Sequence, residues 1–438
     1  MKKIAFYTLG CKVNQADTAS MAEIFLKHGY SIQNFNAEAD IYLINTCVVT
    51  NVGQRKSRQI IHRAVRNHPG ALIVVTGCYP QTAREEVRKI EGIDVIIGNK
   101  ERDRIVELVE EALEKKYGEI LDNVQAMSVD TKFEELAAGN AADKTRAFLK
   151  IQEGCDQYCT YCIIPYARGP LRSRSLSGIR DEVSKFVAAG YKEVVLIGIH
   201  LGCYGKELRS CGRKLSLCDA VEAALSVDGL RRLRLGSLES VEVEKRLLDL
   251  MASDPRLCRH LHLPLQSGCD RILKAMHRPY DTARFRMLLK AIRRQLPGIT
   301  ITTDLIVGFP GETEKDFNDT LSFVKECGFA KVHIFPYSRR NGTPAAAMPE
   351  QVNDIVKAER VTRVAQIESG MRRELLKDMR GRTEEVLFEQ PVDDGHMEGL
   401  CGPYIRVVVP GTEELAGQIR SVRLVGAEED FLYGELLS

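Results

Sequence analysis

The sequence predicts a multidomain α/β protein with a Rossmann-like open α/β domain, a partial (β/α)6 barrel and a small all-β barrel. Two series of short apolar runs alternate with amphipathic helical patterns, which is typical of parallel strands joined by helices. The C-terminal stretch instead contains short strand patterns separated by Gly and Pro turns. The chain has 438 residues, enough for roughly two to four domains, and 44% of them are apolar, which is sufficient for ordinary cores.

Residues 1–121 are expected to form the open α/β domain. Four apolar runs predict parallel strands, and the amphipathic segments between them predict helices, so this part is a series of βαβ units. Residues 122–144 are polar and include AAGNAAD, which is typical of a linker. The predicted strands are KIAFYTL, DIYLINT, ALIVVTG and IDVIIGN, and a helix from Glu101 to Lys116 is expected after the last of them.

Residues 145–370 contain the second βα series, and residues 371–438 follow a different pattern. Six predicted strands favour a partial barrel over a complete eight-stranded one. From Lys357 to Met379 the pattern is helical and rich in Arg and Lys. The barrel strands are AFLKIQ, EVVLIG, RLRLGS, HLHLPL, GITITTDLIVG and KVHIFPY, and the terminal strands are EEVLFEQ, YIRVVVP, GQIRSVRLVGA and FLYGELL.

The low net charge and the lack of long apolar runs limit the kinds of partner that the sequence predicts. The net charge is only +2, so any contact with RNA or a membrane would need a local patch. No run of eighteen apolar residues is present, so we expect no membrane span and no membrane partner. MKKIAFYTLGCK favours a first strand over a signal peptide, which predicts a cytoplasmic protein with reduced thiols. Thirteen cysteines, an odd number, fit a disulfide framework badly.

Three cysteines lie within eight residues directly after the first strand of the second series. Cys155, Cys159 and Cys162 have spacings that let one short loop hold three corners of an iron–sulfur cubane and leave one iron open. Two alternatives stand beside this hypothesis. The cysteines could be incidental, or a zinc site could be completed by His200 or Cys203.

Three further cysteines follow predicted strands of the first domain. Cys11, Cys47 and Cys78 each come just after a strand, and the carboxyl ends of parallel strands meet at the edge where open α/β sheets bind ligands. Each could instead be a small buried residue at a strand end, since free Cys is often buried. Their equivalent positions favour a second iron–sulfur cluster held by three thiolates.

The two cysteine triplets occur in motifs that resemble those of the radical S-adenosyl-L-methionine (SAM) methylthiotransferase family. The loop with Tyr161 before its last Cys resembles that of the radical SAM superfamily, and the terminal module resembles the RNA-binding TRAM barrel. The matching motifs cover nearly the whole chain: TLGCKVN, NTCVVT, VTGCYPQ, EGCDQYCTYCIIPYARG, LIGIHLGCYG, HLHLPLQSGCDRILKAMHR, TTDLIVGFPGETEKDF and HIFPYSRRNGTPAAAM.

The resemblance implies a tRNA-modifying enzyme that inserts a methylthio group at an unactivated C–H bond, using two [4Fe-4S] clusters and two SAM molecules. It implies that Cys11, Cys47 and Cys78 hold an auxiliary cluster that carries the sulfur, and that the loop cluster cleaves SAM. GCKVNQADT, CIIPYARGPLRSR and IGIHLG most resemble the branch acting on N6-threonylcarbamoyladenosine. Branches acting on isopentenyl-adenosine in tRNA or on a ribosomal protein are the alternatives. An electron donor such as flavodoxin or ferredoxin is expected, and the sulfur donor is unknown.

SAM carries a carboxylate, a ribose and an adenine, each of which needs a polar partner. Beside Tyr161, the expected SAM contacts are Ser237, Glu239 and Gln266, because they lie at the ends of predicted barrel strands. Helix capping is the competing interpretation for Ser237 and Glu239.

Contacts with tRNA phosphates are expected where arginines cluster. Three follow the cluster loop, where a solvated charged turn is the alternative, and others precede or lie within the terminal module. The expected RNA-binding residues are Arg168, Arg172, Arg174, Arg372, Arg373, Tyr404 and Arg406.

A non-catalytic RNA-binding protein that senses iron or oxygen is a competing class. Two separate triplets favour the enzyme, because a sensor needs only one labile cluster. A zinc-bound structural protein is a third hypothesis. The remaining seven cysteines have no expected role, and they are Cys203, Cys211, Cys218, Cys258, Cys269, Cys327 and Cys401.

Overall fold

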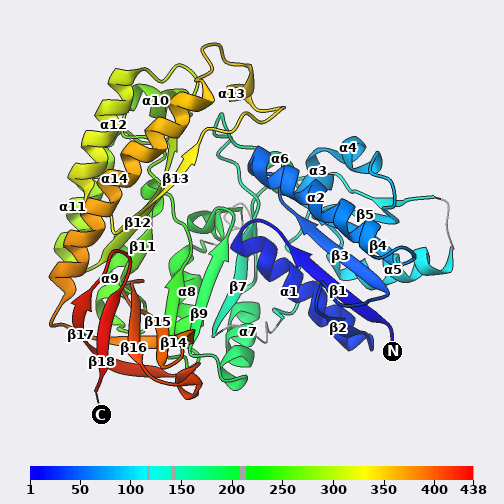
Figure 1. The fold of residues 1–438 in the computed structure, drawn as a ribbon, viewed down its shortest axis with the longest axis horizontal. Helices are drawn as coiled ribbons and strands as arrows, with labels where there is room; N and C mark the ends of the chain where they lie inside the picture. Colours follow the sequence, from blue (N-terminus) through cyan, green and yellow to red (C-terminus); the bar gives the residue numbers. More distant parts are fainter. Residues whose placement is uncertain (116–118, 140–144, 208–213, 438) are drawn as a thin grey trace.

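The computed structural model describes residues 1–115, 119–139, 145–207 and 214–437, which fold into three parts (Figure 1). An open α/β domain lies on the right of the view, a half barrel occupies its left and centre, and a small β barrel lies below the half barrel. The predicted multidomain α/β fold is therefore confirmed. None of the described helices is long and apolar enough to cross a membrane.

The first domain is a three-layer sandwich around a parallel sheet with the strand order β2-β1-β3-β4-β5-β6. Helices α1 and α5 pack on one face, and α2, α3 and α4 pack on the other. The short edge strands β2 and β6 were not predicted, because each has only one apolar residue among its three and so gives little hydrophobic pattern. The strands are β1 (Lys3–Thr8), β2 (Ser31–Gln33), β3 (Ile41–Thr46), β4 (Leu72–Gly77), β5 (Val95–Ile97) and β6 (Leu121–Asn123), and the helices are α1 (Lys12–Lys27), α2 (Asn51–Asn67), α3 (Cys78–Thr82), α4 (Arg84–Arg88) and α5 (Ile105–Glu114).

The half barrel contains all six predicted strands in two sheets, β10-β9-β7-β8 and β11-β12-β13. Isolated parallel bridges, such as the one between Ser237 and His262, join the two sheets. The strands are β7 (Arg146–Glu153), the short antiparallel β8 (Arg172–Ser173), β9 (Glu193–Gly198), β10 (Arg232–Leu235), β11 (His260–His262), β12 (Thr300–Val307) and β13 (Lys331–Pro336). The helices are α6 (Ile164–Arg168), α7 (Leu176–Ala188), α8 (Leu217–Leu225), α9 (Lys245–Ser253), α10 (Asp270–Ala275), α11 (Thr282–Gln295), α12 (Glu314–Cys327) and α13 (Pro344–Ala347).

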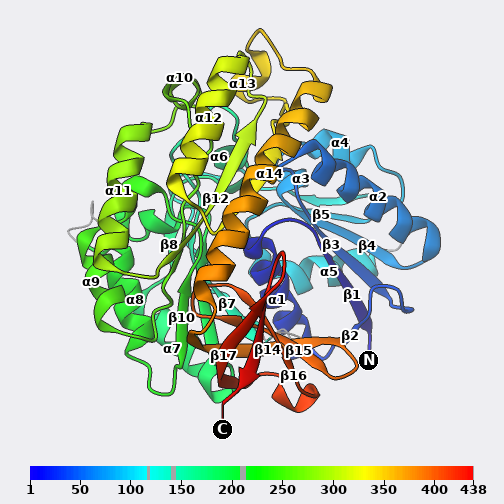
Figure 2. The ribbon, with the colours of Figure 1, turned by 60° about the vertical axis from the view of Figure 1, so that its left-hand side comes forward.

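The terminal module is a closed barrel with the order β14-β15-β16-β18-β17. Its second strand was not predicted, because Gly399 interrupts the apolar alternation there. Helix α14 (Asp354–Met379) crosses the expected boundary at residue 370, because it packs on the half barrel while Leu376 and Met379 enter the core of the module (Figure 2). The strands are β14 (Thr383–Asp393), β15 (His396–Cys401), β16 (Arg406–Pro410), β17 (Ile419–Ala427) and β18 (Leu432–Leu436).

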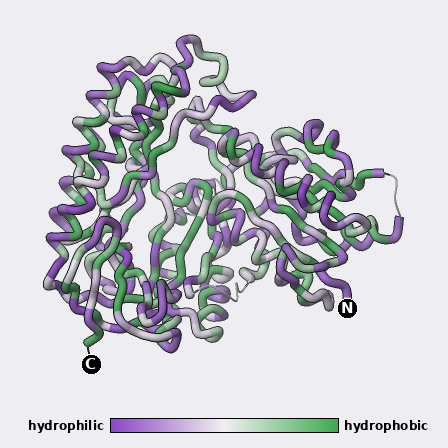
Figure 3. Tube along the Cα trace, in the orientation of Figure 1, coloured by the Kyte–Doolittle hydropathy of each residue, from purple (hydrophilic) through white to green (hydrophobic). Residues whose placement is uncertain are grey.

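Helix α1 joins the first domain to the half barrel. Its Val13 and Ala16 pack against Val195 and Ile197 of β9, on the opposite face of that strand from the main barrel core. Apolar segments run along the strands of both domains, whereas the outer helices are largely hydrophilic (Figure 3). The described part of the expected linker is not free, since Glu134 pairs with Arg102 and Glu135 accepts a hydrogen bond from Ser175 N.

Candidate functional site

The thiols of Cys11, Cys47 and Cys78 converge at the carboxyl edge of the first sheet. Cys47 follows β3, Cys78 begins α3, and Cys11 directly precedes α1. Burial raises the pKa of Cys47 to about 11, and the negative charges of the Cys78 and Cys11 thiolates also raise it. Cys11 keeps an exposed surface, but the surrounding protein removes water from its thiol and raises its pKa, while the Arg168 guanidinium opposes that rise. Metal binding at these thiols would therefore release protons.

Two glycines at positive φ let the chain turn closely around this group. A Cβ on Gly10, whose φ is +98°, would lie 2.9 Å from the Cys47 sulfur. A Cβ on Gly77, also at +98°, would lie 2.4 Å from Asn45 Oδ1. Larger residues would be strained at both positions and would displace the cysteine loops.

Arg168 is fully buried and lies next to the three thiols. Its Nε donates to Cys78 Sγ at 3.3 Å, and its Nη1 lies 2.8 Å from Asp17 and 2.6 Å from Glu153. Arg102 and Lys150 pair with the same two carboxylates. The network therefore fixes the positive guanidinium of Arg168 next to Cys78. A positive charge there attracts a thiolate, which is the form in which Cys78 would bind an iron–sulfur cluster.

The expectation that Arg168, Arg172 and Arg174 contact RNA phosphates is corrected by their burial. All three side chains are at most 4% exposed. Arg172 donates to the carbonyls of Arg168 and Pro170, and Arg174 donates to those of Lys150 and Leu136. These arginines connect the cluster loop to the strand β7 and the linker instead of facing solvent.

Cys155, Cys159 and Cys162 line the loop after β7 and also converge. Burial raises the pKa of Cys162 to about 12, and the negative charges of Cys159 and Cys155 add to that rise. Arg278 Nη1 donates to Cys159 Sγ at 3.1 Å, and its Nη2 pairs with Glu239. Sequence reasoning missed Arg278, although it closes the quoted motif HLHLPLQSGCDRILKAMHR.

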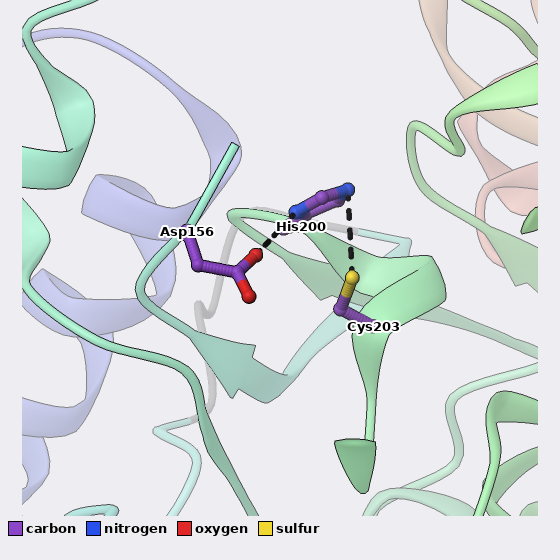
Figure 4. A group of neighbouring side chains, drawn as sticks. All are labelled: Asp156, His200 and Cys203. Atoms are coloured by element: carbon purple, nitrogen blue, oxygen red, sulfur yellow. Dashed lines mark hydrogen bonds and ion pairs between the residues drawn. The ribbon is translucent and has the colours of Figure 1, made fainter. Parts of the chain in front are cut away.

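His200 lies beside this loop, with Asp156 on one side of its ring and Cys203 on the other (Figure 4). Its Nδ1 lies 3.5 Å from Cys155 Sγ, and its Nε2 lies 2.6 Å from Glu242 and 3.6 Å from Cys203 Sγ. Although burial lowers the pKa of His200, the hydrogen bonds to Cys155, Cys203 and Glu242 outweigh it and raise the pKa. Cys203 is thus held beside the cluster loop, not incidental to it.

The four residues expected to contact SAM differ in how far their side chains are already engaged within the protein. Tyr161 Oη lies 3.4 Å from Arg278, and Glu239 is paired with that arginine. Glu239 precedes a short 3-10 helix without a capping bond from its side chain, which removes the capping interpretation for it. Ser237 is exposed at the end of β10. Gln266 follows β11 with φ +64°, and its backbone bonds to Asp304 and Ile306.

The remaining residues expected to bind RNA divide into buried and exposed ones. Arg372 is 8% exposed and donates to the carbonyls of Ala330 and Asp430, so its assignment to RNA is corrected. The Tyr404 ring stacks on His260 at 4.7 Å and lies 4.7 Å from the Arg234 guanidinium, so it is already engaged within the protein. Arg373 is exposed, and Arg406 keeps 40% of its side chain exposed.

The other cysteines carry no site in the described part of the chain. Cys211 lies outside the described residues, and Cys218 is buried in α8, so a surface pair between them does not fit Cys218. The other four are buried, namely Cys258, Cys269, Cys327 and Cys401.

Each triplet fits an iron–sulfur cluster by the chemistry of its donors. Three convergent thiols with a nearby guanidinium suit a cubane that keeps one open iron. We expect about eight irons and eight sulfides per chain after anaerobic reconstitution. Iron and sulfide analysis of a variant with Cys155, Cys159 and Cys162 changed to Ala should give about half of both, whereas Cys218→Ala should give the full amount. Loss of all iron from the triple variant would contradict independent sites.

Comparison with known proteins identifies the family. Residues 3–98 match the uncharacterized protein family UPF0004, and residues 149–324 match the radical SAM superfamily. The threonylcarbamoyladenosine tRNA methylthiotransferase MtaB of Bacillus subtilis is 38% identical over all of this chain and 97% of its own length. The tRNA-2-methylthio-N(6)-dimethylallyladenosine synthase of Pelotomaculum thermopropionicum is 34% identical over all of this chain and 98% of its own length.

Solved structures with a similar fold have low sequence identity to this chain. The radical SAM methyltransferase TsrM of Kitasatospora setae superposes with a TM-score of 0.58 at 14% identity, covering 91% of this chain and 81% of its own. The cobalamin-dependent radical enzyme OxsB gives a TM-score of 0.54 at 12% identity, covering 84% of this chain and 56% of its own. These two solved structures show only that the fold is similar. Family membership follows instead from the sequence identity above 30% over the full length of the relatives named above. The chain belongs to the radical SAM methylthiotransferase family.

Proposed function

We propose that this protein adds a methylthio group to C2 of N6-threonylcarbamoyladenosine next to the anticodon of tRNA. The observation that carries the proposal is the full-length identity of 38% to the Bacillus subtilis enzyme named for that substrate. Identity to the Pelotomaculum synthase is 34%, so the dimethylallyl nucleoside is the second candidate substrate. The two sets of converging thiols support the reaction type, since methylthiolation needs one site for SAM cleavage and another for sulfur.

We assign Cys155, Cys159 and Cys162 to the cluster that binds SAM, and Cys11, Cys47 and Cys78 to the auxiliary cluster. When bound, the first supplies the electron that splits SAM into methionine and a 5′-deoxyadenosyl radical, and the second carries the sulfur that another SAM methylates. Arg278 and Arg168 hold one cysteine of each triplet by a hydrogen bond. The side chains of Ser237 and Gln266 are the candidates for polar contacts with SAM.

The remaining partners follow from the chemistry. An external reductant such as flavodoxin or ferredoxin must deliver electrons, and a sulfur donor of unknown identity must renew the sulfur. The twelve described cysteines are all free, which suits the reducing conditions of the cytoplasm.

Mass analysis of tRNA nucleosides tests the substrate. Cells that lack this protein should accumulate N6-threonylcarbamoyladenosine without its 2-methylthio derivative, and the intact gene should restore the derivative. A gene carrying Cys47→Ala is the matched control and should not restore it. Loss of 2-methylthio-N6-dimethylallyladenosine instead would assign the chain to the other branch.

Exposed arginines near the terminal barrel are proposed to hold tRNA phosphates. Arg373 projects from α14, and Arg420 and Arg423 are exposed on β17. Deletion of the barrel would be a poor test, because the buried Arg232 and Arg234 donate to its carbonyls at Leu400 and Gly402.

A charge reversal is the cleaner experiment for this surface. Arg373→Glu should weaken tRNA binding by on the order of 1 kcal/mol and flatten the dependence of affinity on salt, because a phosphate contact is lost. Titrations at two salt concentrations measure both effects. Arg286→Glu on α11 is the control and should change neither. If Arg286→Glu weakens tRNA binding as much as Arg373→Glu does, the loss comes from the overall change of charge, and the proposed phosphate contact of Arg373 is contradicted.

A further inference from the structure

The inner face of the half barrel next to helix α1 carries polar side chains. Side chains alternate between the two faces of β11 and β12. Leu261 and Leu305 pack in the main hydrophobic core of the barrel, whereas His262 and Asp304 point to the opposite face of their strands. His262 Nε2 lies 3.2 Å from Asp304, and its Nδ1 lies 2.9 Å from Thr302 Oγ1. The Asp304 carboxylate is therefore already paired within the barrel.

Lys12 lies where the three domains meet. It follows Cys11 directly, and its ammonium lies 5.9 Å from the Phe148 ring of β7 and 5.8 Å from the Tyr404 ring of the terminal barrel. Its side chain is exposed, and within the described ranges no carboxylate lies within ion-pair distance of it. Alongside burial and neighbouring charges, its positive charge lowers the pKa of His260 and of His333, so its field reaches the inner face of the barrel.

A cation at a domain junction that has no carboxylate partner among the described residues is suited to an anionic ligand. The two candidate substrates differ in this respect: the threonylcarbamoyl group carries a carboxylate, whereas the dimethylallyl group is uncharged and apolar. Both groups are attached to N6 of adenine, and only ring atom N1 separates the carbon bearing N6 from C2. A side chain adjacent to a ligand of the auxiliary cluster is thus placed to meet the N6 substituent when C2 faces the sulfur.

We propose that Lys12 is a substrate-specificity residue whose ammonium pairs with the carboxylate of the N6-threonylcarbamoyl group. This inference rests on the proposed function and adds to it the side chain that distinguishes the two nucleosides. The contact is a charge-assisted hydrogen bond, which is shorter and stronger than a hydrogen bond between neutral groups. The rings of Phe148 and Tyr404 flank the ammonium and attract its positive charge.

Binding of anticodon stem-loops to the anaerobic, cluster-loaded protein tests the proposal. Three synthetic stem-loops differ only at one adenosine, which is N6-threonylcarbamoylated, carries the methyl ester of that group, or is unmodified. The wild-type protein should bind the free acid roughly tenfold more tightly than the ester. Lys12→Met should bind acid and ester about equally, and Lys12→Arg should recover part of the preference. Lys89→Met removes an exposed charge elsewhere on the same domain and should keep the wild-type preference.

The outcomes separate this inference from the proposed function. Iron analysis of each variant shows whether the auxiliary cluster is retained next to the changed residue. If the wild-type protein methylthiolates the threonylcarbamoyl substrate but binds acid and ester equally, the role of Lys12 is overturned while the proposed function stands. That comparison needs no variant, so it holds even if Lys12→Met loses its cluster. If the wild-type protein methylthiolates only dimethylallyl tRNA, the proposed function itself fails.

Discussion

Changing Cys47 or Cys159 to alanine is expected to separate the two halves of the reaction. Cys159→Ala should produce no 5′-deoxyadenosine, because its loop would lose one of three thiolates and the partner of Arg278. Cys47→Ala should still cleave SAM reductively but should yield no methylthiolated nucleoside, because it changes only the triplet of the first domain. The expected loss of product is complete in both variants.

Chromatography of 5′-deoxyadenosine and mass analysis of the nucleoside measure the two outputs in one anaerobic assay. Cys327→Ala is a suitable control, because that cysteine is buried in α12 and belongs to neither triplet. It should retain both outputs. Full methylthiolation by Cys47→Ala would contradict the assignment of the auxiliary cluster to the first domain.

Arg168→Met should destabilise the protein strongly. The substitution keeps much of the side-chain volume but leaves the buried Asp17 and Glu153 without one of their shared cations. Arg102 and Lys150 still pair with both carboxylates, so the cost is that of the lost buried hydrogen bonds to charged groups, about 1.5–3 kcal/mol each. The variant should also hold the auxiliary cluster less tightly, because Cys78 loses the hydrogen bond from Nε.

Urea unfolding of the anaerobic protein, followed by circular dichroism and by cluster absorbance, measures this effect. Arg84→Met is the matched control, since Arg84 pairs with Asp122 at 2.8 Å but is 42% exposed. It should cost about 1 kcal/mol or less. If Arg168→Met is as stable as the wild-type protein yet binds tRNA weakly, the original phosphate assignment would be right and the structural role wrong.

The sequence by itself determined the fold class and the chemistry. Strongly apolar runs such as DIYLINT and GITITTDLIVG predicted β3 and β12, because fully buried parallel strands leave a continuous hydrophobic signal. The position of Cys11, Cys47 and Cys78 after such strands was enough to expect their convergence, since parallel strands end at one edge. The three-residue strands β2 and β6, and β15 with Gly399 in its middle, left no comparable pattern.

Only the tertiary structure decided which charged side chains are inside. From the sequence, Arg168, Arg172 and Arg174 were expected at the surface, on RNA phosphates or in a solvated turn, because nothing local reveals their buried partners. The same reason hid Arg278, whose partner Glu239 and contact Cys159 come from distant strand ends. Lys12 and Tyr404 are 392 positions apart and meet only because the terminal barrel docks beside α1. Strand patterns are local, whereas the pairing of a charge depends on what the fold brings next to it.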